Sequence, residues 1–135
     1  MTHLSHQVPW ISGTIPLQLV SGKNQRRLVR RGKNGWMFIK KPKALEFMAY
    51  PRDRAWEKIE SNGEPWPWTF PVVLTARCYY ASRRPDLDVA LLMDWLQARG
   101  IIKNDRQCME QHCYKFLDPK NPRTEWQLRA FVEHA

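Results

Sequence analysis

Three aspartates flank one short apolar segment in the second half of the sequence, and their spacing is typical of a site for a hard cation. Asp86 and Asp88 precede the segment, and Asp105 follows it beyond Gly100. If residues 86–88 are extended, side chains two positions apart point to the same side. A helix that turns at Gly100 would bring Asp105 alongside them. Because Mg²⁺ takes oxygen ligands and often binds one or two carboxylates plus a substrate phosphate, the three aspartates are candidate catalytic and metal-binding residues of a phosphodiesterase centre.

Both halves of this acidic set also have a simpler structural explanation, which the sequence leaves open. Asp88 stands where the N-cap of the following helix is expected, and an N-cap carboxylate accepts hydrogen bonds from backbone N–H groups. Asp105 follows Asn104, and this residue pair is ordinary turn chemistry. The spacing is therefore compatible with a metal site and with a purely structural role.

The excess positive charge of the chain is confined to its first third. The net charge is +9, and residues 1–45 hold nine of the 22 Lys and Arg residues and no Asp or Glu, whereas residues 46–135 hold thirteen of each sign. A long acid-free basic stretch is typical of a surface that binds a polyanion. Nucleic acid is favoured over an acidic membrane, because no basic amphipathic helix accompanies the charge. The candidate nucleic-acid-binding residues are Lys23, Arg26, Arg27, Arg30, Arg31 and Lys33.

Length and composition indicate a single packed domain over residues 1–135, with a loosely held N-terminus at residues 1–12. Hydrophobic residues make up 43% of the chain, and seven tryptophans argue for a globule rather than disorder. No apolar run approaches the ~18 residues of a membrane span, and the N-terminus lacks a secretory signal pattern. The three cysteines, an odd count, suit a reducing compartment. We therefore expect a cytoplasmic protein whose partner is neither a membrane nor a small molecule.

Hydrophobic periodicity predicts the elements of the first half of the chain. Residues 14–20 alternate and predict a strand, at a sheet edge because of its proline. Residues 36–39 predict a second strand that forms a hairpin with the first, with the basic arm 26–31 on the loop side. A helix is expected over residues 42–59, bent or split at Pro51.

The second half of the chain has a more regular pattern. Residues 72–80 predict a strand from their Val, Leu, Thr and Tyr content. A helix is expected between Asp88 and Gly100, and two further strands are expected over residues 108–117 and 124–132. This order favours an α+β fold, with a mixed sheet of about four to five strands and two main helices on one face.

A zinc site is disfavoured, although two thiols and an imidazole lie within six residues. Cys108 and Cys113 are five positions apart and so have opposite parity on a strand. Beside His112, no fourth ligand has suitable spacing. We interpret these three as structural or surface residues.

Several short segments from residue 82 onwards together form a recognisable order: Asp-x-Asp, then a helix, then Gly, then Asn-Asp-x-Gln. The segments are Arg84-Pro85-Asp86-Leu87-Asp88, Asp94-Trp95-Leu96 with Gly100, Asn104-Asp105-Arg106-Gln107, and Asp118-Pro119-Lys120-Asn121-Pro122-Arg123-Thr124-Glu125. In these residues the chain resembles the RusA family of Holliday-junction endonucleases. The basic segment from Lys23 to Arg31, followed by Lys40 and Lys41, is similar to the family's N-terminal region. The resemblance covers well over half of the chain.

The resemblance implies a homodimeric α+β enzyme of bacterial or phage-infected cytoplasm. Such an enzyme uses Mg²⁺, or Mn²⁺ as a substitute, to cut four-way DNA junctions by paired phosphodiester hydrolysis. By position, Asp86, Asp88 and Asp105 match the family's metal-binding and catalytic acids. Asn104 stands where a further aspartate often occurs, which removes one negative charge from the expected site.

Two positions depart from the family's pattern. Val89 and Leu92 stand at the offsets where an asparagine and a helix lysine are common, and the missing cation would have to come from Lys103, Arg106 or Lys115. These departures keep two alternatives open. One is a non-catalytic or weakly active module of the same fold that binds branched DNA, and the other is a less selective nuclease for branched or flapped DNA.

Overall fold

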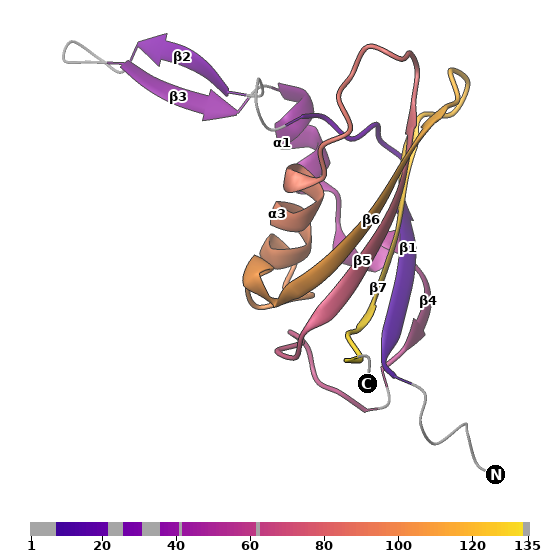
Figure 1. Cartoon of the computed structure of the whole chain (residues 1–135). Helices are drawn as coiled ribbons and strands as arrows, with labels where there is room; N and C mark the ends of the chain where they lie inside the picture. Colours follow the sequence, from indigo (N-terminus) through magenta and orange to yellow (C-terminus); the bar gives the residue numbers. More distant parts are fainter. Residues whose placement is uncertain (1–7, 22–25, 31–35, 41, 62, 134–135) are drawn as a thin grey trace.

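A five-stranded mixed sheet is the centre of the structure (Figure 1), a computed structural model that describes residues 8–21, 26–30, 36–40, 42–61 and 63–133. The strand order is β4-β1-β7-β5-β6. Only β5 and β6 run parallel; the other neighbours are antiparallel. The strands are β1 (Trp10–Ile15), β4 (Trp56–Glu60), β5 (Val72–Tyr80), β6 (Cys108–Leu117) and β7 (Arg123–Ala130).

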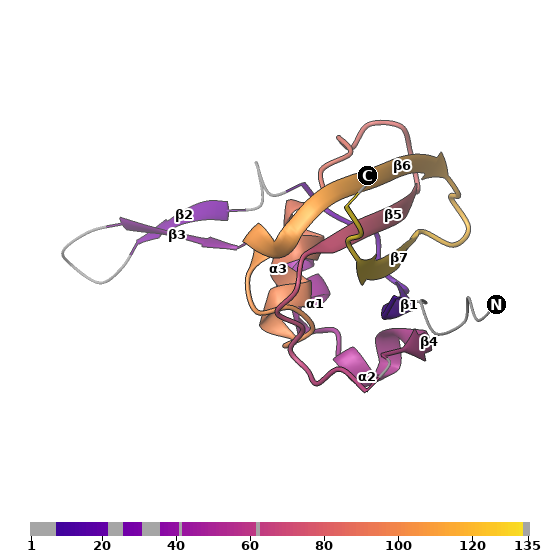
Figure 2. The ribbon, with the colours of Figure 1, turned by 60° about the horizontal axis from the view of Figure 1, so that its bottom comes forward.

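The helices lie on one face of this sheet, as Figure 2 shows. They are α1 (Pro42–Ala49), α2 (Arg52–Ala55) and α3 (Ala90–Ala98). The buried face of α3 supplies Leu92, Trp95 and Leu96, and the ring of Trp95 meets that of Trp126 on β7 edge-on at 5.8 Å. The Trp95 indole N–H donates to the Tyr50 carbonyl at 2.9 Å, which ties α3 to the end of α1. The α+β class and the mixed sheet with two main helices, α1 and α3, on one face are therefore confirmed.

The two faces of the sheet differ because side chains alternate along each strand. On β7, every second residue is buried, including Trp126 and Leu128. On β5 the same alternation buries Leu74, Ala76 and Cys78 beneath the helices. We call this helix-covered side the inner face and the opposite side the outer face. No helix among the described residues is long and apolar enough to cross a membrane.

The first strand lies earlier in the sequence than its alternation predicts. It spans Trp10–Ile15 and is flanked by β4 and β7, so the prediction of an edge strand at residues 14–20 was wrong. Pro16 explains the end point, because proline has no N–H to donate to a ladder. The loose N-terminus expected at residues 1–12 is wrong from Trp10 onwards, and residues 1–7 lie outside the described residues.

The basic arm is a strand in its own right. β2 (Arg26–Arg30) pairs antiparallel with β3 (Trp36–Lys40), and the two form a separate two-stranded ribbon. The hairpin expected between residues 14–20 and 36–39 does not form. In Figure 1 the ribbon extends away from the sheet on the side of the helices.

The helix expected over residues 42–59 ends early. α1 stops at Ala49, before Pro51, and only one further turn, α2, follows. The chain then continues as β4, whose Ile59 pairs with Ile11 of β1. The connection is close-packed, since a Cβ added at Gly13 would lie 1.5 Å from the Ala55 carbonyl oxygen. Strand pairing with β1 therefore overrides the helical periodicity of this segment.

Candidate functional site

Two of the three predicted aspartates line one cavity of about 480 Å³. Its walls are the start of α3, the 3₁₀ turn η3 (Asp105–Gln107) and the inner face of β6. Asp88 comes from the approach to α3 and Asp105 from η3, so the return of the chain at Gly100 brings together residues that are distant in sequence. Gly100 has a φ of +73°, which favours glycine at this turn.

Asp88 is fixed by local hydrogen bonds. One carboxylate oxygen, Oδ1, accepts from the Ala90 N–H at 3.0 Å, and Oδ2 accepts from the Ser21 hydroxyl at 3.1 Å. The first bond ties the carboxylate to the start of α3, where negative charge is favourable to the helix dipole. The N-cap expected at Asp88 is instead Val89, one residue later. Asp88 supports the start of the helix through its bond to the Ala90 N–H, and it also lines the cavity.

Asp105 is positioned by a capping box around its neighbours. The Asn104 side chain accepts from the Arg106 N–H at 2.9 Å, and Gln107 Oε1 accepts from the Asn104 N–H at 2.8 Å. The Gln107 amide also donates to the carbonyls of Trp68 and Phe70, at 2.8 and 2.9 Å. The Asn-Asp-x-Gln motif thus anchors η3 to the chain before β5, and this anchoring sets the position of Asp105.

A third carboxylate in this cavity, Asp94, was not among the predicted ligands. It lies on α3 four residues after Ala90, and Ala90, Met93 and Asp94 all line the cavity. Residues at these spacings share one helix face. The sequence did contain a signal for this position of Asp94. Asp88 precedes the helix, and the helical periodicity places Asp94 on the helix face that follows Asp88.

Asp86 lies elsewhere. It lines a separate cavity of about 310 Å³ together with Ser21, Lys43 and Arg84, and its backbone carbonyl accepts from the Tyr80 hydroxyl at 3.4 Å. Residues 81–89 form no strand, so the extended geometry that would have aligned Asp86 with Asp88 is not imposed by a ladder. The structure thus places Asp88 and Asp105 on one cavity and Asp86 on another.

The residues of the larger cavity fit a divalent cation held by two carboxylates better than a preassembled three-acid centre. Among the described residues, no group of three or more His, Cys, Asp or Glu side chains is close enough to hold a metal ion. Mg²⁺ commonly binds through one or two carboxylates, with water and substrate phosphate completing its shell. Asp88 and Asp105 match that donor set.

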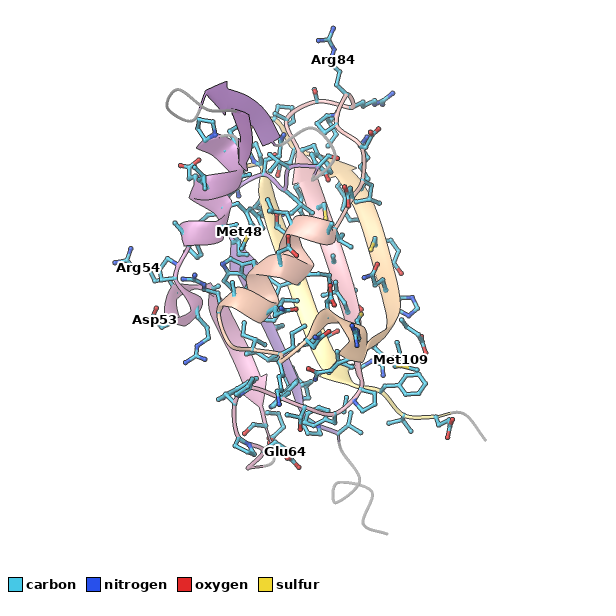
Figure 3. All side chains as sticks on the ribbon, turned by 90° about the vertical axis from the view of Figure 1, so that its left-hand side faces the viewer. Met48, Asp53, Arg54, Glu64, Arg84 and Met109 are labelled. Atoms are coloured by element: carbon cyan, nitrogen blue, oxygen red, sulfur yellow. The ribbon has the colours of Figure 1, made fainter. Side chains whose placement is uncertain are left out.

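The loop that carries Asp86 and Asp88 is held from β6. The Lys115 ammonium donates to the Arg83 carbonyl at 2.9 Å and to the Pro85 carbonyl, and it lies 5.6 Å from the centre of the Tyr80 ring. Burial, followed by Cys78 and Asp88, raises the pKa of Tyr80, so its hydroxyl stays a neutral donor. Of the three cations considered as substitutes for the family's helix lysine, Lys115 is the one that contacts this loop. Arg84, at the tip of the loop, points away from the body in Figure 3.

The thiols around the cavity are protonated at neutral pH. Burial raises the pKa of Cys108 and of Cys113, both of which line the cavity, and raises the pKa of the neighbouring Cys78 to about 12. His112 lies on the outer face and contacts Glu110 at 3.0 Å. Alternation along β6 separates His112 from Cys113, and the register shift between Val72 and Val73 brings Cys108 to the same cavity as Cys113, despite their opposite parity in the sequence.

Half of the predicted nucleic-acid-binding residues fall on one strand of the ribbon. Arg26, Arg27 and Arg30 belong to β2, which pairs residue by residue with β3. The other three, Lys23, Arg31 and Lys33, lie outside the described residues. The ribbon lies on the same side of the sheet as the helices (Figure 1).

Comparisons with known proteins add no relative. No protein-family model matches the sequence, and no curated protein matches it.

Proposed function

We propose that this protein is a metal-dependent endodeoxyribonuclease that resolves four-way DNA junctions, like the RusA family that its sequence resembles. The observation that carries the proposal is the shared cavity of Asp88 and Asp105, which are separated by an entire helix in sequence. The acid-free basic N-terminal third supports a nucleic acid as substrate. The order of the RusA-like motifs along the chain supports a four-way junction as the form of that substrate.

Asp88 and Asp105 would hold Mg²⁺, or Mn²⁺ in its place, beside the N-terminal end of α3. A divalent ion bound there supplies a water of lowered pKa and offsets charge on the phosphate oxygens. Asp94, on the same cavity wall, is placed to orient a water by accepting its proton in a hydrogen bond. Asp86 acts from the neighbouring cavity, by holding the loop in place or by joining the ion when DNA binds.

A four-way junction requires two such centres at a fixed separation, and hence a homodimer. The β2–β3 ribbon of each copy, with the flanking lysines and arginines, would contact the phosphates of one arm. These contacts make binding strongly salt-dependent. A role in DNA recombination or repair would put the protein in the cytoplasm of a bacterium or a phage-infected host.

The test is a cleavage assay on a labelled four-way junction, with and without Mg²⁺ and Mn²⁺. We expect Asp88→Asn and Asp105→Asn to abolish cleavage, by at least about a hundredfold, with junction binding retained or tighter because a negative charge near phosphate is removed. The matched control is Asp53→Asn, an exposed acid on α2 that Figure 3 shows far from Met109 at the start of β6. Undiminished cleavage in both variants would remove the proposal.

The alternative is a module that binds branched DNA without cutting it. It is favoured by Leu92, which is fully buried in the core, so that this helix position cannot present a cation to the cavity. Binding of the junction by the unmodified protein without nicking, under any divalent ion, would identify this function. A panel of flapped and three-way DNA substrates distinguishes the junction-specific enzyme and the binding module from a less selective nuclease.

A further inference from the structure

The outer face of the sheet carries aromatic rings and guanidinium groups, and none of the helices in the described part of the chain covers it (Figure 2). Alternation along β5, β6 and β7 places a different set of side chains here from the apolar set on the inner face. Successive rows across the three strands can be followed in the ladder registers. The residues of the two rows nearest the β6–β7 turn are Phe116, Tyr79 and Arg123 in one, and Tyr114, Arg77 and Glu125 in the other.

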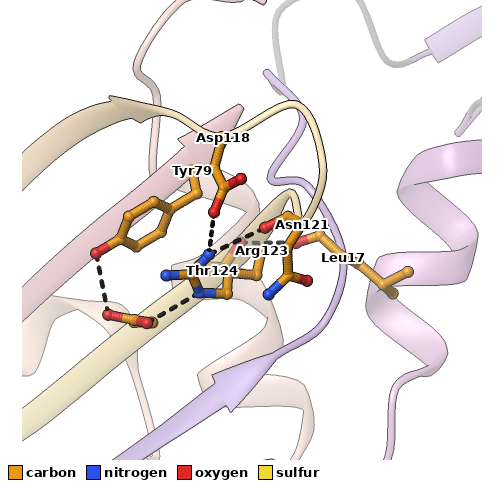
Figure 4. Close-up of polar contacts among 7 residues, drawn as sticks. Leu17, Tyr79, Asp118, Asn121, Arg123 and Thr124 are labelled. Atoms are coloured by element: carbon orange, nitrogen blue, oxygen red, sulfur yellow. Dashed lines mark hydrogen bonds and ion pairs between the residues drawn. The ribbon is translucent and has the colours of Figure 1, made fainter. Parts of the chain in front are cut away.

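The first row is a continuous stack. The rings of Phe116 and Tyr79 lie 4.9 Å apart at 20°, and the Arg123 guanidinium lies 3.7 Å from the centre of the Tyr79 ring. Arg123 is held in turn by Asp118 at 2.8 Å and by Glu125 at 3.0 Å (Figure 4). The Tyr79 hydroxyl donates to the same Glu125 carboxylate at 3.3 Å. These bonds make the stack rigid, so Phe116 is backed by fixed groups although 42% of it is exposed.

The second row leaves a cation uncommitted. Arg77 pairs with Glu125 in the ladder, but the Glu125 carboxylate is engaged by Arg123 and by Tyr79. Among the described residues, Arg77 forms no ion pair, and it is exposed. Its other neighbour in the row, Tyr114, is 47% exposed. An exposed guanidinium therefore stands beside two exposed rings.

This combination matches an unpaired nucleic-acid strand better than a protein surface. Aromatic residues and arginine are enriched at protein interfaces too, but glutamate is depleted there, whereas here Glu125 lies within the patch and is paired with Arg123. Aromatic rings interleaved with arginines are the usual way of binding single strands, since every base has a face that stacks and the arginines meet the phosphates.

The spacing of the rings excludes stacked duplex bases as the ligand. Tyr114 and Phe116 are two residues apart on β6, a step of about 6.6 Å on an extended strand. That is about twice the 3.4 Å rise per nucleotide of stacked DNA. Adjacent bases must unstack to occupy both rings, which an unpaired strand does at little cost.

We propose that the outer face is a binding site for single-stranded DNA, in which Tyr114 and Phe116 stack on bases and Arg77 contacts the backbone. β6 links this site to the candidate cleavage site, because its Gln111 and Cys113 line the inner cavity while Tyr114 and Phe116 lie on the opposite face. A DNA strand that leaves the cavity and passes around the free edge of β6 reaches the rings of Tyr114 and Phe116. The use of this site during cleavage rests on the proposed function, whereas the binding itself does not.

The experiment measures the affinity of the full chain for a labelled oligothymidylate of about 20 nucleotides by fluorescence anisotropy, in EDTA so that no cleavage occurs. We expect the double variant Tyr114→Ala/Phe116→Ala to bind at least about 25-fold more weakly, since each of the two base stacks contributes a factor of about five or more. Tyr114→Phe/Phe116→Tyr keeps both rings and is expected to retain the affinity. Arg77→Gln is expected to lower the slope of log affinity against log salt by about 0.7.

The matched control is Leu45→Ala, which removes an equally exposed apolar side chain from α1. Circular dichroism and light scattering of each variant report the fold and the oligomeric state. Unchanged oligothymidylate affinity in a folded Tyr114→Ala/Phe116→Ala protein would overturn the inference. A change of that variant from dimer to monomer with affinity retained would also overturn it, because the face would then be an interface between copies. Ring-dependent binding by a protein that cuts no junction would leave this site standing and refute the proposed function alone.

Discussion

The two faces of β6 contrast within a single strand. Towards the helices, the strand presents Gln111 and Cys113 to a cavity that also contains carboxylates. On the other side it presents Tyr114 and Phe116, rings that are close to half exposed. One face thus holds groups suited to a cation and the other holds groups suited to bases and phosphates. The edge of a sheet can therefore carry two chemically opposite sites a few ångströms apart, because alternation alone separates them.

The contrast extends to energetics, since the inner face is part of the core and the outer face is not. Substitutions on the inner side should chiefly change the free energy of unfolding. Substitutions on the outer side should chiefly change binding.

Leu92→Lys should be strongly destabilising. The variant introduces the lysine that is common at this offset in the RusA family, but Leu92 is fully buried against the sheet, and an unpaired buried ammonium is costly. We expect a loss of about 3 kcal/mol or more in the free energy of unfolding, measured by urea denaturation. Ala98→Lys, at an exposed position of the same helix, is the control and should be near neutral. A stable and more active Leu92→Lys protein would show that α3 is rotated relative to the structure.

Alkaline pH should destabilise the protein through Cys78 on the inner face of β5. Burial raises the pKa of its thiol to about 12, above the ~8.5 of an unfolded cysteine. The folded state therefore holds this proton more tightly, and the resulting stability is complete below about pH 8.5 and is lost as the pH rises towards 12. We expect the free energy of unfolding to fall by about 1 kcal/mol per pH unit more steeply in the unmodified protein than in Cys78→Ala. Equal slopes between pH 8 and 10.5 would contradict the burial of this thiol.

Lys115→Met should loosen the loop before α3 with a small cost in global stability. The variant removes the donor to the Arg83 and Pro85 carbonyls, an exposed interaction worth roughly 1 kcal/mol. Faster hydrogen exchange over residues 83–88 is the expected readout, with Lys120→Met, another exposed lysine, as the control. If the amides of residues 83–88 exchange equally fast in Lys115→Met and Lys120→Met, then Lys115 does not hold the loop.

The second half of the fold could be predicted from the sequence because its signals are local. β5 has a continuous run of strand-forming residues, and α3 has helical spacing that ends at a glycine. The proximity of Asp88 and Asp105 followed from the same signals, since a helix that reverses at Gly100 returns to its start. The position of Asp86 could not be predicted in this way. Its alignment with Asp88 required residues 86–88 to be extended, and no neighbouring strand imposes that conformation.

The first half could not be predicted because tertiary contacts decide it. β1 contains Gly13 in place of an apolar residue, so its alternation is weak, and the reason for the glycine is the Ala55 carbonyl that approaches it. The segment of β4 has a pattern that also fits a helix, and only its pairing with β1 makes it a strand. The outer-face stack was missed for a similar reason, since Tyr79, Phe116 and Arg123 meet only across three strands.

The metal centre proposed at Asp88 and Asp105 is tested most directly by titrating the protein with Mn²⁺ and following the titration by electron paramagnetic resonance, in the absence of DNA and again with an uncleavable junction. We predict one ion per subunit whose binding is lost in both Asp88→Asn and Asp105→Asn and is unchanged in Asp53→Asn. Binding that survives both of the first two substitutions would contradict the assignment of this cavity as the metal centre.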